Sequence, residues 1–297
     1  MDNINMNLTL LTFGERLENH YQACFAILTF LRDPQIEKVI VITDRPDFYR
    51  VFGDRIEFIE INQTTLQKWQ GKYHFFWRVK IKALQTVQAQ YPAQHLLYVD
   101  SDTFLATPLT EMQHQLNQGQ TFMHLKEGVL SEQSNRTWQK MHRTLVGKTF
   151  ANIEIRPDSV MWNAGVVALP AEKAQAILAL ALQLCDEICG TDCERKLVEQ
   201  FSFSVALNQH QPLQPCNTII GHYWGNKTEW NNMIADFFVN AQLKNLSLQD
   251  CIALLAEKDW NELPLSKKQR NTNAKLKKFI DWIFPDKNIY YFKQKVR

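Results

Sequence analysis

Glycine and proline are scarce in this sequence: each occurs ten times among 297 residues, and neither is clustered. No internal repeat and no low-complexity segment is present, which excludes a repeat architecture and a flexible linker between separate domains. The longest apolar run near the start, ACFAILTFL at residues 23–31, is too short to span a bilayer. The first twenty residues hold no basic segment followed by a small-residue cleavage site. We therefore expect a cytoplasmic protein.

Cysteine spacing of the kind that builds a zinc site is also absent. Zinc sites commonly use pairs of ligands separated by two residues, whereas Cys185, Cys189 and Cys193 recur at every fourth position with no second Cys or His pair nearby. On a continuous helix these three residues would share one face. In a cytoplasmic chain of this size we expect all six cysteines to be reduced and to pack as small apolar residues.

Basic charge is concentrated at the C-terminus. Residues 267–297 contain ten Lys or Arg and two Asp, a net charge of +8, so the remaining residues carry −6 within a total of +2. Aromatic residues are interleaved with these lysines, a pattern that suits an anionic membrane surface and also suits nucleic acid. The alternative is a C-terminal helix that packs through its aromatics. The candidate partner of residues 267–297 is therefore the anionic inner face of a membrane, to which the protein would bind peripherally. We expect no nucleic-acid partner.

Apolar segments alternate with helical patterns through the first hundred residues. Unbroken apolar runs suit strands that are covered on both faces, and apolar residues at helical spacing suit amphipathic helices. The resulting order, β-α-β-β-α-β, predicts an open α/β sheet. We expect strands at residues 6–13, 38–44, 56–61 and 96–100, and helices at residues 17–31 and 73–90.

The second half of the chain is less regular. Strands are expected at residues 121–128, 160–170 and 215–225, and helices at residues 171–189 and 194–208. From about residue 229 the pattern is helical, and Ser247 is the expected N-cap of one of these helices. We predict a catalytic domain at residues 1–240 and a helical, basic and aromatic extension at residues 241–297.

The segment LLYVDSDTF, residues 96–104, carries an apolar strand directly into Asp100, Ser101 and Asp102. Ligands of open α/β sheets sit beyond the carboxyl ends of strands, and side chains two residues apart project to the same side of an extended segment. Two such carboxylates can hold a divalent cation that keeps positions open for phosphates. A helix N-cap or a polar turn is the alternative interpretation, because Asp is common in both.

Three further segments place polar residues at expected strand or helix ends. Asn163-Ala164-Gly165 interrupts an apolar strand, where glycine marks a bulge or a close approach, although simple packing would also account for it. Glu199-Gln200 opens a helix, where a solvated first turn is the plain alternative. The segment GHYWGNK, residues 221–227, joins His222 to Gly225 and Lys227 at the end of a strand.

Taken in order, these four segments resemble the GT-A-fold glycosyltransferases, and most closely the retaining family of glycogenin and bacterial lipooligosaccharide galactosyltransferases, glycosyltransferase family 8. The resemblance covers roughly residues 6–230. It implies a Rossmann-like mixed sheet flanked by helices, followed here by the basic extension. It also implies that Mn²⁺ or Mg²⁺ is held by Asp100, Asp102 and His222 and bridges the diphosphate of a nucleotide sugar.

The resemblance assigns further residues to the donor. Lys227 and Gly225 would contact the phosphates, and Ser101 would lie with them beside the nucleotide. Asn163 would hold the transferred sugar, and Glu199 with Gln200 would line the sugar pocket. Candidate nucleotide contacts with weaker support are Thr12, Arg78 and Lys82; for the last two, a solvated helix face is the alternative.

Several positions depart from the family pattern. Glu199 stands where the family has Asp, and Thr228-Glu229-Trp230 follows Lys227 where the family has Pro-Trp. The first strand also lacks the family's acidic nucleotide-contact pattern.

The expected function is metal-dependent transfer of a hexose from a nucleotide sugar, a UDP-sugar, to a glycan or lipid-linked glycan of a bacterial surface polysaccharide or lipooligosaccharide, with retention of configuration. One alternative is a nucleotidyltransferase that makes sugar nucleotides, but no Gly-rich phosphate loop follows the first strand. A second alternative is a non-catalytic nucleotide-sugar-binding protein, which the intact set of Asp100, Asp102 and His222 disfavours.

Overall fold

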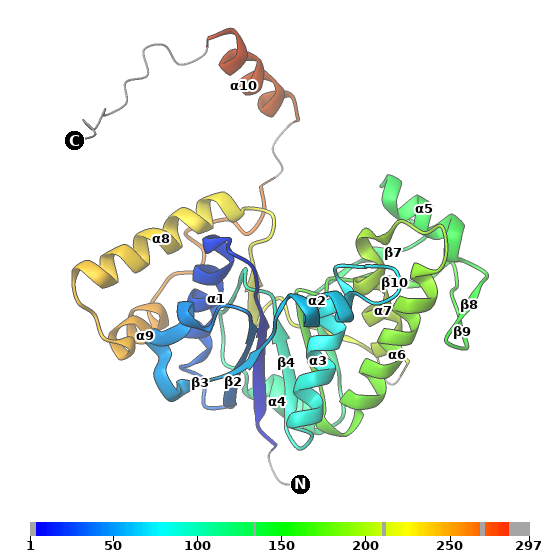
Figure 1. The fold of residues 1–297 in the computed structure, drawn as a ribbon, viewed down its shortest axis with the longest axis horizontal. Coiled ribbons are helices and arrows are strands. Elements are labelled where there is room, and N and C mark those ends of the chain that lie inside the picture. Colours follow the sequence, from blue (N-terminus) through cyan, green and yellow to red (C-terminus); the bar gives the residue numbers. More distant parts are fainter. Residues whose placement is uncertain (1–3, 133–134, 210–211, 268–270, 285–297) are drawn as a thin grey trace.

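The computed structural model describes residues 4–132, 135–209, 212–267 and 271–284, and its centre is a seven-stranded sheet (Figure 1). The strand order is β12-β6-β11-β4-β1-β2-β3. β1 pairs in parallel with β2 and β4, whereas β11 is antiparallel to β4 and β6. The expected α/β fold with a mixed sheet flanked by helices is therefore confirmed. The strands are β1 Met6–Leu11, β2 Ile36–Thr43, β3 Ile56–Glu60, β4 His95–Val99, β6 Phe122–Met123, β11 Val166–Leu169 and β12 Gln214–Pro215.

Helices cover both faces of this sheet, which explains the unbroken apolar runs. On one face α3, α6 and α7 pack against Ile40, Ile42 and Leu96, and on the other α1, α8 and α9 pack against Val39 and Val41. The two faces alternate along each strand because successive side chains point to opposite sides. The helices are α1 Leu17–Phe30, α2 Gln63–Gln70, α3 Arg78–Gln90, α4 Thr110–Asn117, α5 Arg136–Leu145, α6 Ala171–Cys189, α7 Val198–Leu207, α8 Lys227–Leu243, α9 Leu248–Ala256 and α10 Asn271–Ile283, with 3₁₀ segments η1 Pro46–Arg55 and η2 Arg195–Leu197.

The strand expected at residues 160–170 is broken in two, and this break shapes the site. β10, Val160–Trp162, pairs with β7, Lys126–Val129, outside the main sheet, while β11 returns to the centre of the main sheet. Asn163, Ala164 and Gly165 make the turn between them. The strand expected at 121–128 is divided in the same way, into β6 and β7. Two short strand pairs complete the fold: β5 Thr103–Leu105 with β13 Ile220–His222, and β8 Thr149–Phe150 with β9 Ile153–Glu154.

Several helix boundaries differ from the expectation. α3 begins at Arg78 rather than near residue 73, because turns with positive φ at Gly71 and His74 precede it. α2 is an additional helix that the sequence pattern did not indicate. The boundary predicted between residues 240 and 241 falls inside α8, and Ile252 and Leu255 of α9 belong to the same core as α1. The expected cap at Ser247 is confirmed, with a capping box to Asp250.

Two further expectations concern chemistry rather than topology. All six cysteines are buried and free of disulfides, as expected for small apolar packing residues. Within the described residues, no helix combines the length and the apolar character that a membrane crossing requires.

Candidate active site

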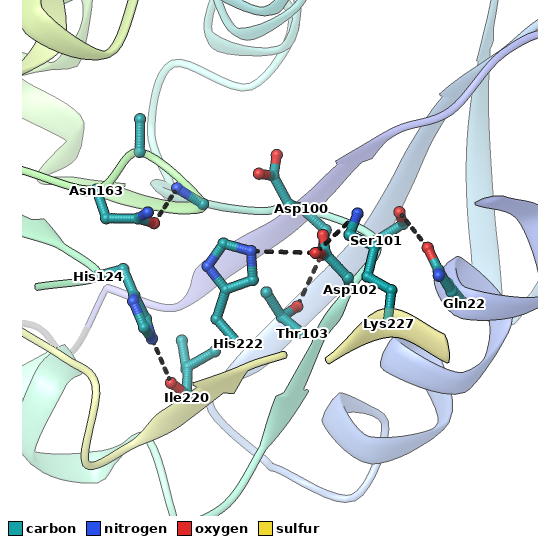
Figure 2. Close-up of polar contacts among 12 residues, drawn as sticks. Gln22, Asp100, Ser101, Asp102, Thr103, His124, Asn163, Ile220, His222 and Lys227 are labelled. Atoms are coloured by element: carbon teal, nitrogen blue, oxygen red, sulfur yellow. Dashed lines mark hydrogen bonds and ion pairs between the residues drawn. The ribbon is translucent and has the colours of Figure 1, made fainter. Parts of the chain in front are cut away.

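Asp100, Asp102 and His222 meet at the carboxyl edge of the sheet. β4 ends at Val99, so the two aspartates occupy the turn between β4 and β5. β5 pairs antiparallel with β13 in a register that sets His222 opposite Thr103, next to Asp102. One ligand atom of each of the three residues lies within 4.8 Å of the others, and Figure 2 shows the His222 ring directed at Asp102. The convergence expected from sequence positions 120 residues apart is therefore present.

Asp102 is the most enclosed of these groups and is held in its ionised form. Its side chain is 5% exposed, and Oδ2 lies 3.3 Å from His222 Nε2 and 2.9 Å from Lys227 Nζ. Burial alone would raise the pKa of this carboxyl, but the hydrogen bond from His222 and the charge of Lys227 outweigh it and lower the pKa below its usual value. A buried carboxylate that stays charged is a strong ligand for a cation.

Asp100 has a different environment, open on one side. Its carboxylate accepts a hydrogen bond from the Tyr98 hydroxyl at 2.6 Å and lies 3.3 Å from Lys80 Nζ. Its backbone N–H donates to the carbonyl of Gly165 at 2.7 Å, which ties the turn after β4 to the break before β11. The two aspartates therefore present carboxylates of unequal exposure to the same space.

The donor set fits a manganese or magnesium ion. Two carboxylates supply hard oxygen ligands, and one imidazole shifts the preference from calcium towards manganese. His222 turns Nε2 towards the carboxylates, 3.3 Å from Asp102 Oδ2, so this is the ring nitrogen that could bind the ion. We conclude that Asp100, Asp102 and His222 form a candidate metal site.

Gly165 is required where it stands because of the His222 ring. A Cβ atom at this position would lie 2.2 Å from His222 Cε1, closer than any real contact. The neighbouring Asn163 closes the turn, with its Oδ1 accepting from the Gly165 N–H at 3.0 Å. The interruption between β10 and β11 therefore makes room for the imidazole and fixes the side chain of Asn163.

Lys80 is a site residue that the sequence analysis missed. Its ammonium is buried and lies 3.1 Å from Glu199 Oε1, and it donates to the carbonyl of Ala164 at 3.1 Å. Burial would lower the pKa of Lys80, but the carboxylates of Asp100 and Glu199 outweigh it and raise the pKa above its usual value. For Glu199, burial is the larger effect and raises the pKa despite the charge of Lys80. A fixed positive charge therefore stands beside Asp100.

Arg78 and Lys82, the two basic residues chosen from this helix by sequence, do not reach the site. Arg78 pairs with Asp186 at 2.6 Å, and Lys82 donates to Gln85 at 2.8 Å. Arg78 and Lys82 share one face of the helix because they are about one turn apart. Lys80 is rotated by about 200° from each of them and so lies on the opposite face. The buried face of α3, formed by Val79, Ala83, Leu84 and Val87, includes position 80 and could have identified it.

Glu127 is a second residue that sequence reasoning missed. Oε1 accepts from Asn163 Nδ2 at 2.9 Å and Oε2 accepts from Gln200 Nε2 at 2.9 Å. Glu199 and Gln200 therefore point to different partners, the first to Lys80 and the second to Glu127. No pattern around Glu127 marks it, because it lies in a short strand outside the main sheet.

Two cavities meet at the aspartates. The first, about 290 Å³, is lined by Thr12, Phe13, Phe76, Trp77, Lys80, Asp100, Ser101, Asp102 and Lys227 among others. The second, about 450 Å³, is lined by Asp100, Asp102, Glu127, Asn163, Gln200, His222, Trp224 and Lys227 among others. The carboxylates and Lys227 thus stand between two chambers, an arrangement that can hold two reactants on either side of one ion.

The remaining expected donor residues differ in their placement. Thr12 lines the first cavity and hydrogen-bonds the Tyr49 hydroxyl at 2.5 Å, and Ser101 donates to Gln22 at 3.3 Å. Gly225 lines neither of these two cavities. Ser266 fills the space that a side chain at position 225 would need, because its Oγ would lie 2.4 Å from a Cβ there.

The segment after Lys227, which departs from the family pattern, has a structural use in this chain. Glu229 accepts from Asn226 at 3.0 Å, and Trp230 stacks on Tyr223 with ring centroids 4.5 Å apart. Phe104 of β5 stacks on both Trp230 and Trp260, with ring centroids 4.9 and 4.2 Å apart. This aromatic stack supports β5 and β13, the strands that carry Asp102 and His222 to one another.

Comparison with known proteins gives similarity at the level of three-dimensional structure only. No family model matches the sequence, and no curated protein sequence matches it. Mouse xyloside xylosyltransferase 1 in its apo form aligns at 13% identity and a TM-score of 0.46, over 72% of this chain and 86% of that one. The galactosyltransferase LgtC, solved in complex with donor and acceptor sugar analogues, aligns at 14% identity and a TM-score of 0.44, over 67% and 69%. Both are glycosyltransferases, the class that the sequence resembles.

Proposed function

We propose that this protein transfers a hexose from a nucleotide sugar, a UDP-sugar, to a glycan acceptor. The observation that carries the proposal is the position of Asp100, Asp102 and Lys227 between two cavities, with His222 completing the candidate metal site. A transferase needs a chamber for the nucleotide, a chamber for the sugar and acceptor, and positive charge where they meet. Two cavities and the lysine ammonium group between them are suited to these three tasks.

The first cavity has the features of a nucleotide chamber. Phe13, Phe76 and Trp77 supply aromatic faces on which a base can stack. Lys80 and Lys227 supply positive charge towards the aspartates, where a diphosphate would lie. Because charge on the diphosphate increases as the sugar departs, ammonium groups held in position stabilise the leaving group more than the bound donor.

A Mn²⁺ or Mg²⁺ ion held by Asp100, Asp102 and His222 supplies Lewis-acid stabilisation of the same diphosphate. The protein's own contribution is to keep those ligands ionised and aligned. Lys227 holds Asp102 as a carboxylate, and Gly165 leaves the space that the His222 ring occupies.

The second cavity has the features of a sugar and acceptor chamber. Asn163, Gln200 and Glu127 form a connected set of hydrogen-bonding groups suited to sugar hydroxyls. Trp224, which is 56% exposed, offers an apolar face to a sugar ring. Proximity of the acceptor hydroxyl to the anomeric carbon is the main task of this chamber.

Incubation with a panel of UDP- and other nucleotide sugars plus Mn²⁺, followed by measurement of free nucleotide, tests this proposal. Slow release of UDP supports transfer. Release of pyrophosphate from UTP and a sugar phosphate would instead support a nucleotidyltransferase, and binding without turnover would support a non-catalytic protein. NMR of the product then tests retention of configuration at the anomeric carbon.

A further inference from the structure

The C-terminal helix α10 exposes a large apolar surface. Its described apolar side chains are Leu276, Phe279, Ile280, Trp282 and Ile283, and each is between 43% and 76% exposed. A helix advances about 100° per residue, so these residues together with Phe284 cover an arc of about 200°. These exposed side chains do not bury themselves against the rest of the protein, as the alternative of a packed C-terminal helix requires.

Lysines lie at both borders of this apolar arc. Lys277 falls next to Phe284 on one border, and Lys278 falls next to Trp282 on the other, each about 20° to 40° away around the helix. Lysine stems can lie along apolar surface while the ammonium reaches outwards to charged groups. A wide apolar face with lysines at both borders and a tryptophan near one of them is the pattern of a helix lying in a lipid–water interface.

The chain that leads into α10 is attached to the active-site loop. Ser266 forms a β-bridge with Gly225, and Lys267 donates its N–H to the Gly225 carbonyl at 3.1 Å. Pro264 accepts from Asn226 at 2.8 Å. Asn271, the first residue of α10, is four residues beyond Lys267 and therefore lies within about 14 Å of that anchor. Lys227 is two residues from Gly225, so a surface bound by α10 is held close to the candidate phosphate site.

We propose that α10 binds in the interface of an anionic membrane and so holds the mouth of the site beside lipid-linked acceptors. The binding surface rests on the helix itself, whereas the acceptor class rests on the proposed function. The net charge of +8 over residues 267–297 favours anionic headgroups, and the apolar arc favours the acyl boundary. Self-association of two such helices would bring lysines of like sign together, and nucleic acid would leave the apolar arc in water.

Flotation of the full chain with vesicles tests the binding. The wild type should rise with vesicles of phosphatidylcholine and phosphatidylglycerol, and less with phosphatidylcholine alone. Phe279→Ser with Ile280→Ser should reduce partitioning by about tenfold or more, since the variant loses two apolar side chains that the membrane would bury. Lys277→Glu with Lys278→Glu should reduce it too, and added salt should weaken the wild type. The matched control is Val239→Ser with Leu243→Ser on α8, two exposed apolar residues expected to leave flotation unchanged.

Three outcomes overturn the proposal. The first is equal flotation of the wild type and the Phe279→Ser, Ile280→Ser variant, and the second is loss with the α8 control of the same size. The third is α10-dependent self-association or RNA binding with no flotation. Nucleotide release in the absence of vesicles, which the α10 variants should retain, reports separately on the transferase. Flotation without turnover would refute the transferase and leave the membrane surface standing.

Discussion

The ammonium of Lys80 lies 3.1 Å from the carboxylate of Glu199, with both side chains more than 90% buried. This pair joins α3 to the first turn of α7, behind Asp100. Removing one partner leaves the other as an uncompensated buried charge. Lys80→Met should therefore lower the free energy of unfolding by about 3 kcal/mol, as measured by urea denaturation. Lys82→Met, two residues along the same helix, should cost far less, and equal losses in the two variants would contradict this role.

Asp102→Asn removes one negative charge from the candidate metal site while keeping the shape of the side chain. We expect Mn²⁺ binding, followed by electron paramagnetic resonance of the free ion, to weaken by at least about 100-fold, comparable with the loss of a ligand or its support. Asp158→Asn is the control, because Asp158 pairs with Arg156 at the exposed surface. Unchanged Mn²⁺ affinity in Asp102→Asn would refute the assignment of the candidate metal site.

Gly165→Ala introduces a Cβ where the His222 ring stands, at 2.2 Å from Cε1. The ring must move, and a displacement of about 1 Å at a reacting site can cost on the order of 100-fold in rate. We expect strongly reduced nucleotide release and weaker Mn²⁺ binding, with near-native circular dichroism. Wild-type turnover in this variant would show that the ring position does not matter.

His124 should make the fold sensitive to mild acid. Burial, together with the charge of the nearby His222, lowers the pKa of this imidazole from 6.5 to about 4. The unfolded chain takes up the proton first, so stability is full above about pH 6.5 and falls as the pH drops towards 4, by on the order of 2 to 3 kcal/mol. Urea denaturation at pH 7 and pH 4.5 measures this loss, which His124→Gln should reduce. A His124→Gln variant with the same pH slope as the wild type would contradict the assignment.

Trp77 and Trp224 offer a matched pair for the two chambers. Stacking of a base on an aromatic ring contributes about 1–3 kcal/mol, so Trp77→Ala should weaken UDP binding by roughly 5- to 150-fold in calorimetry. Trp224→Ala, in the second cavity, should leave UDP affinity unchanged and impair use of an acceptor. The reverse pattern would assign the nucleotide to the second cavity and the acceptor to the first. A lack of UDP binding by the wild type would refute the donor site itself.

The candidate metal site could be predicted from the sequence because its polar residues lie at strand ends. Asp100 and Asp102 follow β4, and the general rule for α/β sheets places ligands beyond the carboxyl ends of such strands. His222 reaches them because β13 pairs with β5, outside the seven-stranded sheet. Gly165 was recognisable as a close approach, although only the coordinates identify the His222 ring as the group approached.

Lys80 and Glu127 could not be read from local patterns with the same ease. A lysine inside an apolar helix face is buried only if a partner from a distant segment neutralises it, and that partner, Glu199, follows 119 residues later. Glu127 depends on the break between β6 and β7, which the apolar pattern of residues 121–128 conceals. Long-range pairing, rather than propensity, decides both positions.

The contact between Gly225 and Ser266 makes the final described turn before α10 a structural part of the loop that carries Lys227. Proteolytic cleavage just before residue 264 would leave the sheet and both cores complete, with Trp260 and Leu263 still in place, yet would free that loop from its outer support. Damage of this kind would loosen the loop that carries Lys227 before any loss of folding could be detected.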